Sequence, residues 1–290
     1  MKSRFSHIIL SVLILSLALQ AITLPALAQS EPIQSQAEIE VPINLPENRL
    51  VSFPDHRDGQ PYPEDEIVFD CETVIDVSIP ECEALLAFYQ STNGHNWLNK
   101  SGWLQSTTVG NWHGVEVTVG IGVTVLYFFG NQLSGSIPTE LGDLSNLQVL
   151  ALWRNQLSGS IPAELGDLAN LYVLDLNENQ LEGSIPSSLG ELSNLEFLSL
   201  SFNNLTGSIP TELGNLDKLQ ELTLNHNQLS GSIPLSFVNL KSLKTFYANN
   251  TNLCEPKTPE FIAWKENLNF WNEPGRICDD MLICLPLILR

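Results

Sequence analysis

Histidines, cysteines and carboxylates carry most enzyme and metal chemistry, and in this chain they are scattered. The histidines outside the N-terminal segment are His56, His95, His113 and His226. None has a Cys, a Ser-Gly pair or a Glu at the spacing of a metal site or a catalytic triad. Asp175 and Glu178 form a carboxylate pair, but acidic residues are common throughout this chain. We therefore expect no enzymatic activity, no cofactor and no metal site.

One short loop, Asp55-His56-Arg57-Asp58-Gly59, superficially suggests a calcium site. A calcium loop supplies oxygen ligands at alternate positions. Arg57 occupies one of those positions here. We therefore expect no metal at this loop.

The chain repeats itself every 24 residues between Val123 and Leu253. Two consecutive units read SNLQVLALWRNQLSGSIPAELGDL and ANLYVLDLNENQLEGSIPSSLGEL. An Asn recurs at Asn131, Asn155, Asn179, Asn203 and Asn227, and an Ile-Pro pair ends at Pro138, Pro162, Pro186, Pro210 and Pro234. Self-similarity at this period predicts a solenoid, in which each unit contacts only its neighbours.

Each unit contains the elements of one solenoid coil. Leu174 and Leu176 alternate with Val173, Asp175 and Asn177, which is the period of a short strand with one buried face. Stacking such strands makes a six-stranded parallel sheet over a leucine core. The Asn that follows is expected to bond backbone groups that leave the sheet unpaired, forming a ladder from unit to unit. Gly and Pro bend the chain, and Leu-Gly-x-Leu returns it through a short 3₁₀ turn.

These units resemble the plant-type leucine-rich repeat, LxxLxLxxNxLxGxIPxxLGxL, as found in plant receptor ectodomains and secreted bacterial proteins. Five units match, and a sixth from Lys241 has Thr251 in the Asn slot and lacks Ile-Pro. The resemblance implies a leucine-rich-repeat solenoid of the α/β repeat class. It would have a parallel sheet on the concave face, 3₁₀ turns on the convex face and a helical or irregular cap at each end.

The N-terminal part of the chain predicts export. Lys2 and Arg4 precede an apolar run and the small residues Ala26-Leu27-Ala28, which is typical of a signal peptide over residues 1–28. Residues 29–70 are acidic and Pro-rich and predict a disordered lead. The formal net charge of −20 disfavours nucleic acid and anionic membranes as partners. No later apolar run is long enough to span a bilayer.

We assign residues 71–120 to an N-terminal cap, 121–252 to the repeats and 253–290 to a C-terminal cap and tail. A helical pattern near Leu85 precedes Trp97, Trp103 and Trp112, whose surroundings resemble the cap of plant-type repeats, and we expect the three indoles to cover the end of the leucine core. Asn252-Leu253-Cys254 resembles the start of the family's C-terminal cap. Apolar residues follow at near-helical spacing: Phe261, Trp264, Leu268 and Trp271.

Five cysteines remain to be explained in an exported chain, where thiols form disulfides. We pair Cys71 with Cys82 and Cys254 with Cys278, which puts one bridge at each end of the solenoid. Cys284 is left over or exchanges with Cys278, and the sequence does not fix the connectivity.

The outward face of the predicted sheet is the candidate binding surface. Phe129 and Trp153 hold the same slot in neighbouring units, with Tyr127 two residues away on the same face and Arg154 beside them. Asp175 and Glu178 follow in the next unit. Aromatic side chains next to an arginine and carboxylates are typical of surfaces that anchor a partner. The alternative is that the N-terminal cap partly covers these aromatics.

The family resemblance implies a secreted or cell-surface, monomeric recognition module that binds a protein or peptide ligand, by analogy of fold. Two alternatives stay open. One is a carbohydrate-binding or hydrolase-inhibiting protein, in which aromatics stack on a polysaccharide. The other is an adhesion protein of the cell surface.

Overall fold

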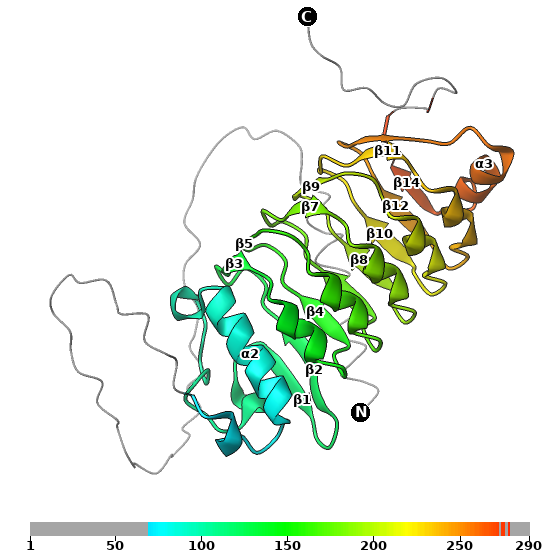
Figure 1. Cartoon of the computed structure of the whole chain (residues 1–290). Coiled ribbons are helices and arrows are strands. Elements are labelled where there is room, and N and C mark those ends of the chain that lie inside the picture. The colour runs from blue at the N-terminus through cyan, green and yellow to red at the C-terminus, as the bar shows by residue number, and fades with distance from the viewer. Residues whose placement is uncertain (1–68, 273, 276–277, 279–290) are drawn as a thin grey trace, which may run out of the picture. The chain divides into compact units, whose positions relative to one another are not determined.

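The computed structural model describes residues 69–272, 274–275 and 278. The chain divides into two units, Met1–Pro63 and Glu64–Arg290, and all described residues belong to the second. The predicted signal peptide, residues 29–68 of the predicted lead, Cys284 and the apolar tail lie outside the described residues. Figure 1 shows the described part as a series of similar coils between two caps.

An eight-stranded sheet runs the length of the described part, in the order β1-β2-β4-β6-β8-β10-β12-β14. Its strands are β1 Val115–Thr118, β2 Gly122–Tyr127, β4 Val149–Ala151, β6 Val173–Asp175, β8 Phe197–Ser199, β10 Glu221–Thr223, β12 Thr245–Tyr247 and β14 Phe270–Asn272. The six strands from β2 to β12 are those that the repeat predicts. Each cap adds one more, because β1 pairs antiparallel with β2 and β14 pairs parallel with β12.

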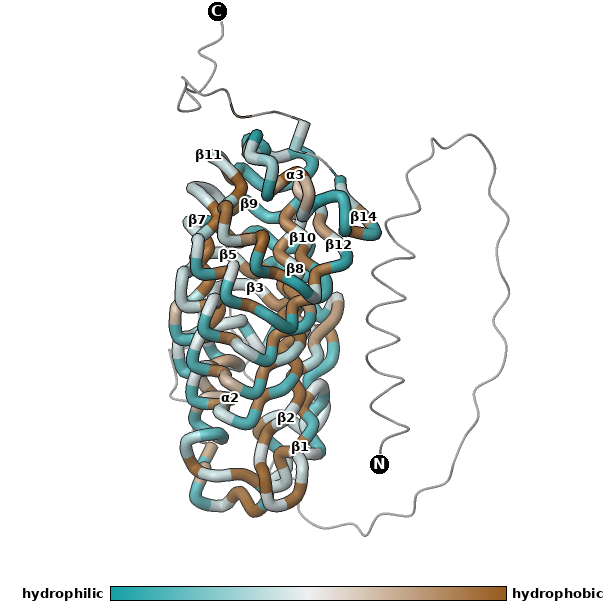
Figure 2. The backbone as a smooth tube through the Cα atoms, turned by 90° about the vertical axis from the view of Figure 1, so that its right-hand side faces the viewer, coloured by the Kyte–Doolittle hydropathy of each residue, from teal (hydrophilic) through white to brown (hydrophobic). Residues whose placement is uncertain are grey.

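The leucines of every unit fill a continuous core behind this sheet. In the third unit Leu171, Leu174, Leu176 and Leu181 are fully buried, and the equivalent positions of the other units belong to the same cluster. Figure 2 shows the apolar residues recurring along the stacked coils. A fully buried leucine contributes about 1.5–3 kcal/mol, and it is buried only because the next coil covers it.

A 3₁₀ helix crosses the opposite side of each coil, as predicted. These are η4 Thr139–Asp143, η5 Ala163–Asp167, η6 Ser187–Glu191, η7 Thr211–Asn215 and η8 Leu235–Asn239. Each begins directly after the proline of its Ile-Pro pair, which occupies the N-cap position. Proline suits this place because its fixed φ starts the turn and its missing N–H would have no partner there.

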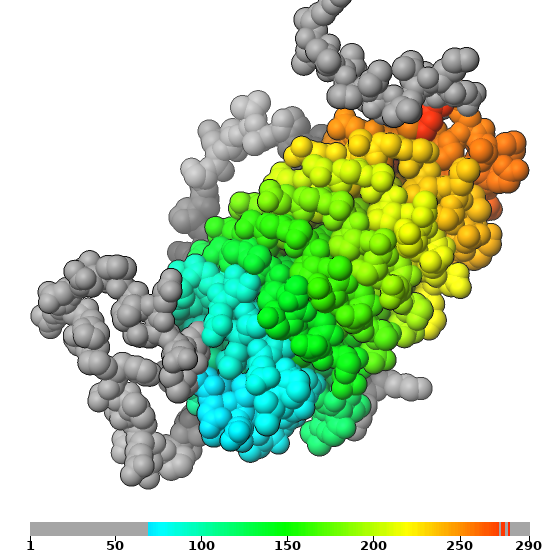
Figure 3. Space-filling model, viewed as in Figure 1, coloured from blue at the N-terminus to red at the C-terminus, as the bar shows by residue number. Residues whose placement is uncertain are grey.

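Three two-stranded parallel sheets lie on the bend after the Asn, and the sequence analysis did not predict them. They pair β3 Ser134–Ser136 with β5 Gln156–Ser158, β7 Glu182–Ser184 with β9 Asn204–Thr206, and β11 Ser230–Ser232 with β13 Asn252–Cys254. Figure 3 shows successive units packed as adjacent bands from cap to cap. The pairs form because neighbouring coils already lie at strand spacing.

The predicted asparagine ladder is present inside the coils. Asn179 Nδ2 donates to the carbonyls of Leu152 and Leu176, both at 3.1 Å, and its Oδ1 accepts from the Leu157 N–H at 3.0 Å. Asn203 and Asn227 make the same three kinds of bond. The ladder therefore satisfies backbone groups that the turn leaves out of the sheet.

The N-terminal cap closes the first coil with aromatic side chains. Helix α2 (Ile79–Ser91) begins with a capping box between Ser78 and Glu81, and three short 3₁₀ helices surround it: η1 Cys71–Thr73, η2 Gly94–Asn96 and η3 Val109–Asn111. Trp97, Trp103 and Trp112 are buried and pack through ring contacts of 4.7–5.0 Å. The tryptophans thus cover the end of the leucine core, as expected.

The C-terminal cap differs from its predicted form. Helix α3 spans Pro259–Lys265 and buries Phe261 and Trp264. The near-helical spacing was wrong for Trp271, which lies in β14. That position adds a strand to the open edge of β12, and Trp271 still packs on Phe246, with ring centroids 5.0 Å apart.

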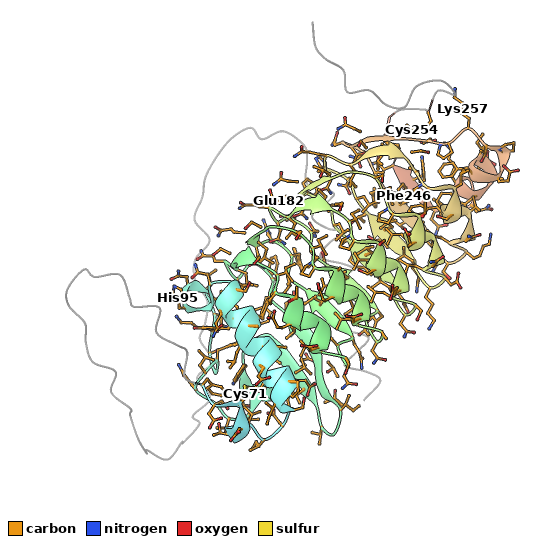
Figure 4. All side chains as sticks on the ribbon, viewed as in Figure 1. Cys71, His95, Glu182, Phe246, Cys254 and Lys257 are labelled. Carbon is orange, nitrogen blue, oxygen red and sulfur yellow. A yellow bond between two sulfur atoms is a disulfide. The ribbon has the colours of Figure 1, made fainter. Side chains whose placement is uncertain are left out.

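Two disulfides hold the caps. The structure contains bridges between Cys71 and Cys82 and between Cys254 and Cys278. Figure 4 shows Cys71 and Cys254 at opposite ends of the repeats. On the chain-entropy model each loop closure stabilises by about 3 kcal/mol. Both bridges are placed where a solenoid would otherwise fray.

Candidate binding surface

The outer face of the main sheet, meaning the face turned away from the leucine core, carries two columns in register. The first contains Val125, Val149, Val173, Phe197, Glu221 and Thr245, and the second contains Tyr127, Ala151, Asp175, Ser199, Thr223 and Tyr247. None of these side chains belongs to the core cluster. They form the surface that the strand period predicts.

Phe129 and Trp153 form an aromatic pair on this face. Their ring centroids are 3.9 Å apart and their planes are inclined by 31°. The Arg154 guanidinium carbon lies 5.9 Å from the Phe129 centroid, within cation–π range. The adjacency predicted from the 24-residue spacing is therefore present. Within the described residues, Tyr127 has no ring contact with this pair and stands in the column of Ala151 and Asp175.

The charged residues of the candidate site form one ion pair. Arg154 Nε lies 3.5 Å from Glu178 Oε2, and both side chains are partly exposed. Both residues adopt left-handed backbone conformations, with φ of 60° and 52°, at the same turn of successive coils. An exposed pair of this kind contributes at most about 1 kcal/mol, so either partner is free to be recruited by a ligand.

Two polar atoms of the site have no hydrogen-bond partner: Trp153 Nε1 and Asp175 Oδ2. All six tryptophans lie within the described residues, and the indoles of the other five donate to protein oxygens. Trp153 and Asp175 are only 2% and 1% exposed. These two atoms are a donor and an acceptor that make no hydrogen bond within the protein.

Burial raises the pKa of the Asp175 carboxyl to about 7, while hydrogen bonds from Asn177 and Ser199 act in the opposite direction. Burial and the nearby Asp175 charge also raise the pKa of Tyr127. Desolvation disfavours the charged carboxylate, so the shift follows from the burial of this side chain. A cation above Asp175 would lower this pKa and keep the carboxylate charged.

A second ring pair lies further along the same edge. Phe202 stacks on His226, with centroids 4.1 Å apart and planes inclined by 12°. Asn250 Nδ2 lies 2.9 Å from His226 Nε2. The 24-residue period could have predicted this contact, because Phe202 and His226 occupy the position of Arg154 and Glu178 in later units.

The described residues contain no group of three or more His, Cys, Asp or Glu side chains placed to hold a metal ion. Among the helices of residues 69–272, none combines the length and apolarity required to cross a membrane.

Comparison with known families supports the repeat assignment. Leucine-rich-repeat family models match residues 145–205, 122–144 and 218–240. These segments contain the strands, ladder asparagines and 3₁₀ turns described above. The chain is a plant-type leucine-rich-repeat protein. No curated protein sequence matches this leucine-rich-repeat chain significantly.

Solved structures of plant proteins resemble this leucine-rich-repeat chain. A plant ice-binding protein is 30% identical with a TM-score of 0.60, over 65% of this chain and 61% of that one. The ectodomain of the Arabidopsis thaliana receptor kinase SOBIR1 is 29% identical with a TM-score of 0.55, over 64% of this chain and 100% of that one. The Arabidopsis receptor kinase HAESA, in complex with the peptide hormone IDA and the co-receptor SERK1, is 30% identical with a TM-score of 0.59. The match covers 67% of this chain and 33% of HAESA.

Proposed function

We propose that this protein is an extracellular, non-enzymatic recognition module that binds a protein or peptide ligand on the outer face of its main sheet. The fold is that of receptor ectodomains, one of which binds a peptide hormone. Two disulfides and the signal-like N-terminal sequence support an extracellular location. A monomer suffices, because every element of the site comes from one chain.

The observation that carries the proposal is the unpartnered indole N–H of Trp153. Buried indoles usually find an acceptor, as the other five do here. Trp153 instead stacks on Phe129 beside Arg154 and directs no hydrogen bond to the protein. A large aromatic anchor with a free donor next to an arginine is the composition of a binding hot spot.

The site favours a peptide with mixed chemistry. A backbone carbonyl would accept from Trp153 Nε1, and an apolar side chain would pack on the Phe129 ring. A lysine or arginine would meet Asp175 Oδ2, which accepts nothing from the protein, and Glu178 lies in the same unit. The chain's net charge of −20 also attracts a basic partner at long range.

The double substitution Phe129→Ala/Trp153→Ala is expected to weaken peptide binding at least tenfold, since each removed anchor is worth about 2 kcal/mol at a hot spot. Peptides selected from a random phage-displayed library on the wild-type protein serve as probes, with affinities measured by interferometry. The variant should still fold and melt cooperatively, because neither ring belongs to the leucine core cluster, although Trp153 is buried.

The matched control is Phe202→Ala/His226→Ala, which removes the second ring pair from the same edge. Its affinity for the selected peptides should change less than threefold. Equal affinity of the Phe129/Trp153 variant and wild type, with equal melting temperatures, would remove the outer face from consideration. A library that yields no micromolar binder would contradict the proposal as a whole.

A second candidate function, ice binding, is favoured by the face that carries the small sheets. Mostly uncharged polar side chains face each other there across neighbouring coils at strand spacing, about 4.8 Å. The register pairs Ser134 with Gln156, Ser136 with Ser158, and Ser184 with Thr206. The similarity to a plant ice-binding protein points the same way.

Ice recrystallisation separates the two candidates. If this face binds ice, micromolar wild-type protein will arrest crystal growth, and Ser184→Tyr at the centre of the array will abolish the arrest. The Phe129→Ala/Trp153→Ala variant on the other side of the coil will leave it unchanged. Crystal growth equal to that in an albumin control would eliminate ice binding.

A further inference from the structure

A shallow pocket of about 280 Å³ lies at the edge of the main sheet, where β4, β6 and β8 begin. Its lining consists of Gln148, Asn170, Tyr172, Asn194, Glu196 and Lys218. The residues that immediately precede those three strands are Gln148, Tyr172 and Glu196. They stand in one column, because each backbone N–H donates at 2.9 Å to the carbonyl of the equivalent residue in the preceding coil, which is Thr124, Gln148 and Tyr172 in turn. The pocket is distinct from the Phe129–Trp153 pair, and its lining comes from four successive coils.

Hydrogen bonds from the repeat hold the lining in place. Asn170 Nδ2 donates to the Ser145 carbonyl at 2.9 Å, and Asn194 Nδ2 donates to the Ala169 carbonyl at 2.7 Å. Lys218 Nζ donates to Asn194 Oδ1 at 2.6 Å. A preorganised set of polar groups binds a ligand without the entropic cost of ordering side chains.

Other polar groups of the pocket remain open. Among the described residues, nothing donates to Asn170 Oδ1, and neither the Tyr172 hydroxyl nor the Gln148 amide has a hydrogen-bond partner. Glu196 uses Oε2 to accept from Gln220 Nε2 at 2.8 Å, which leaves Oε1. The pocket therefore offers donors and acceptors around one half-buried aromatic ring.

The charges of this lining cancel. Its one acidic residue is Glu196 and its one basic residue is Lys218. A phosphate or carboxylate ligand would be repelled by Glu196 and by the long-range field of a chain with net charge −20. A cationic ligand would meet Lys218, and an apolar ligand would leave the amides without partners, which costs free energy. These comparisons favour an uncharged, hydroxyl-rich ligand with an apolar face.

We propose that this pocket binds one pyranose ring of a neutral glycan. Tyr172 packs against the C–H face of the ring, while Gln148, Asn170 and Glu196 bond its hydroxyls. The volume lies just below the ~300–1,000 Å³ of drug-sized ligand pockets, as suits a single ring. The inference is independent of peptide binding on the outer face, because the two sites share no residue.

The test is a titration of purified protein with soluble neutral oligosaccharides (glucan, xylan and mannan fragments) and with an acidic oligogalacturonide. At least one neutral fragment binds at submillimolar concentration, and the acidic one binds at least fivefold more weakly. Tyr172→Ala lowers the neutral affinity at least tenfold, whereas Tyr172→Phe, which keeps the ring, lowers it less than fivefold. Gln148→Ala produces an intermediate loss.

Two controls separate this site from the rest of the protein. Lys244→Ala alters the same column three coils beyond Tyr172, outside the pocket, and leaves the affinity within twofold. Phe129→Ala/Trp153→Ala leaves sugar binding unchanged whether or not it abolishes peptide binding. No binding of any neutral fragment, or equal binding by Tyr172→Ala and wild type, overturns the proposal. Sugar binding lost only in the Phe129/Trp153 variant moves the glycan to the outer face and likewise overturns it.

Discussion

Asn179→Ala is expected to lower the free energy of unfolding by about 3 kcal/mol, because it leaves buried backbone groups without partners. The Leu157 N–H loses its acceptor, Asn179 Oδ1 at 3.0 Å. The carbonyls of Leu152 and Leu176 each keep one donor, from Asn155 and Asn203. The substitution thus produces one orphaned donor, two weakened acceptors and a small cavity.

The loss corresponds to a fall in melting temperature of roughly 6–12 °C for a domain of this size. Differential scanning calorimetry or urea unfolding would measure it. The control is Gln180→Ala, which truncates the exposed neighbouring side chain and should change stability by less than about 0.5 kcal/mol. A variant at Asn179 that melts within 2 °C of wild type would show that the ladder is not a main source of stability.

The last repeat unit keeps only part of the asparagine ladder. Thr251 stands in the slot of the asparagines, and its Oγ1 donates to the Ala248 carbonyl at 2.6 Å. A hydroxyl supplies one donor, whereas an amide supplies two. Thr251 keeps the bond within its own coil, whereas an asparagine also reaches the preceding coil, as Asn227 Nδ2 reaches the Leu200 carbonyl at 2.9 Å. Thr251 departs from the sequence pattern, while the structure shows a shortened form of the same contact.

The coil, its leucine core, its ladder and its 3₁₀ turn followed from the sequence because each is local and repeated five times. The caps followed less well, because they occur once and no period supports them. Trp271 illustrates the failure: its spacing from Trp264 and Leu268 fits a helix, but the free edge of β12 recruits it as a strand. Pairing with an open edge is a tertiary effect that residue spacing does not contain.

The candidate site was predictable in its membership and not in its details. Phe129 and Trp153 occupy equivalent positions in consecutive units, so the 24-residue period predicts that they lie side by side. That Trp153 lacks a hydrogen-bond partner while five other indoles have one depends on which protein oxygens the fold brings within reach. The Tyr172 pocket was missed for a similar reason. It requires Asn170, Asn194 and Lys218, from three different units, to line one pocket with Tyr172.

The glycine of Leu-Gly-x-Leu sets the distance between neighbouring coils. A Cβ added at Gly190 would lie 2.4 Å from the Glu212 carbonyl oxygen and 2.7 Å from its Cβ, in the 3₁₀ helix of the next unit. Gly142, Gly166 and Gly214 meet the next coil in the same way. In the last 3₁₀ helix the slot holds Val238, and there the neighbour is α3 instead of another 3₁₀ helix. Glycine is therefore used where a further coil must approach.

Gly190→Ala is expected to destabilise the protein by about 3 kcal/mol, since overpacking against fixed backbone forces the two coils apart. The matched control is Gly183→Ala. Gly183 has a φ of 78° but has open space, its nearest neighbour being Ser160 Cβ at 3.7 Å, so alanine there costs only the left-handed strain of about 1–2 kcal/mol. Helix propensity alone predicts the reverse order, because alanine favours the helical backbone of η6. Urea unfolding of both variants decides between them: a smaller loss at Gly190 than at Gly183 would mean that the coils can separate slightly without losing their shared core.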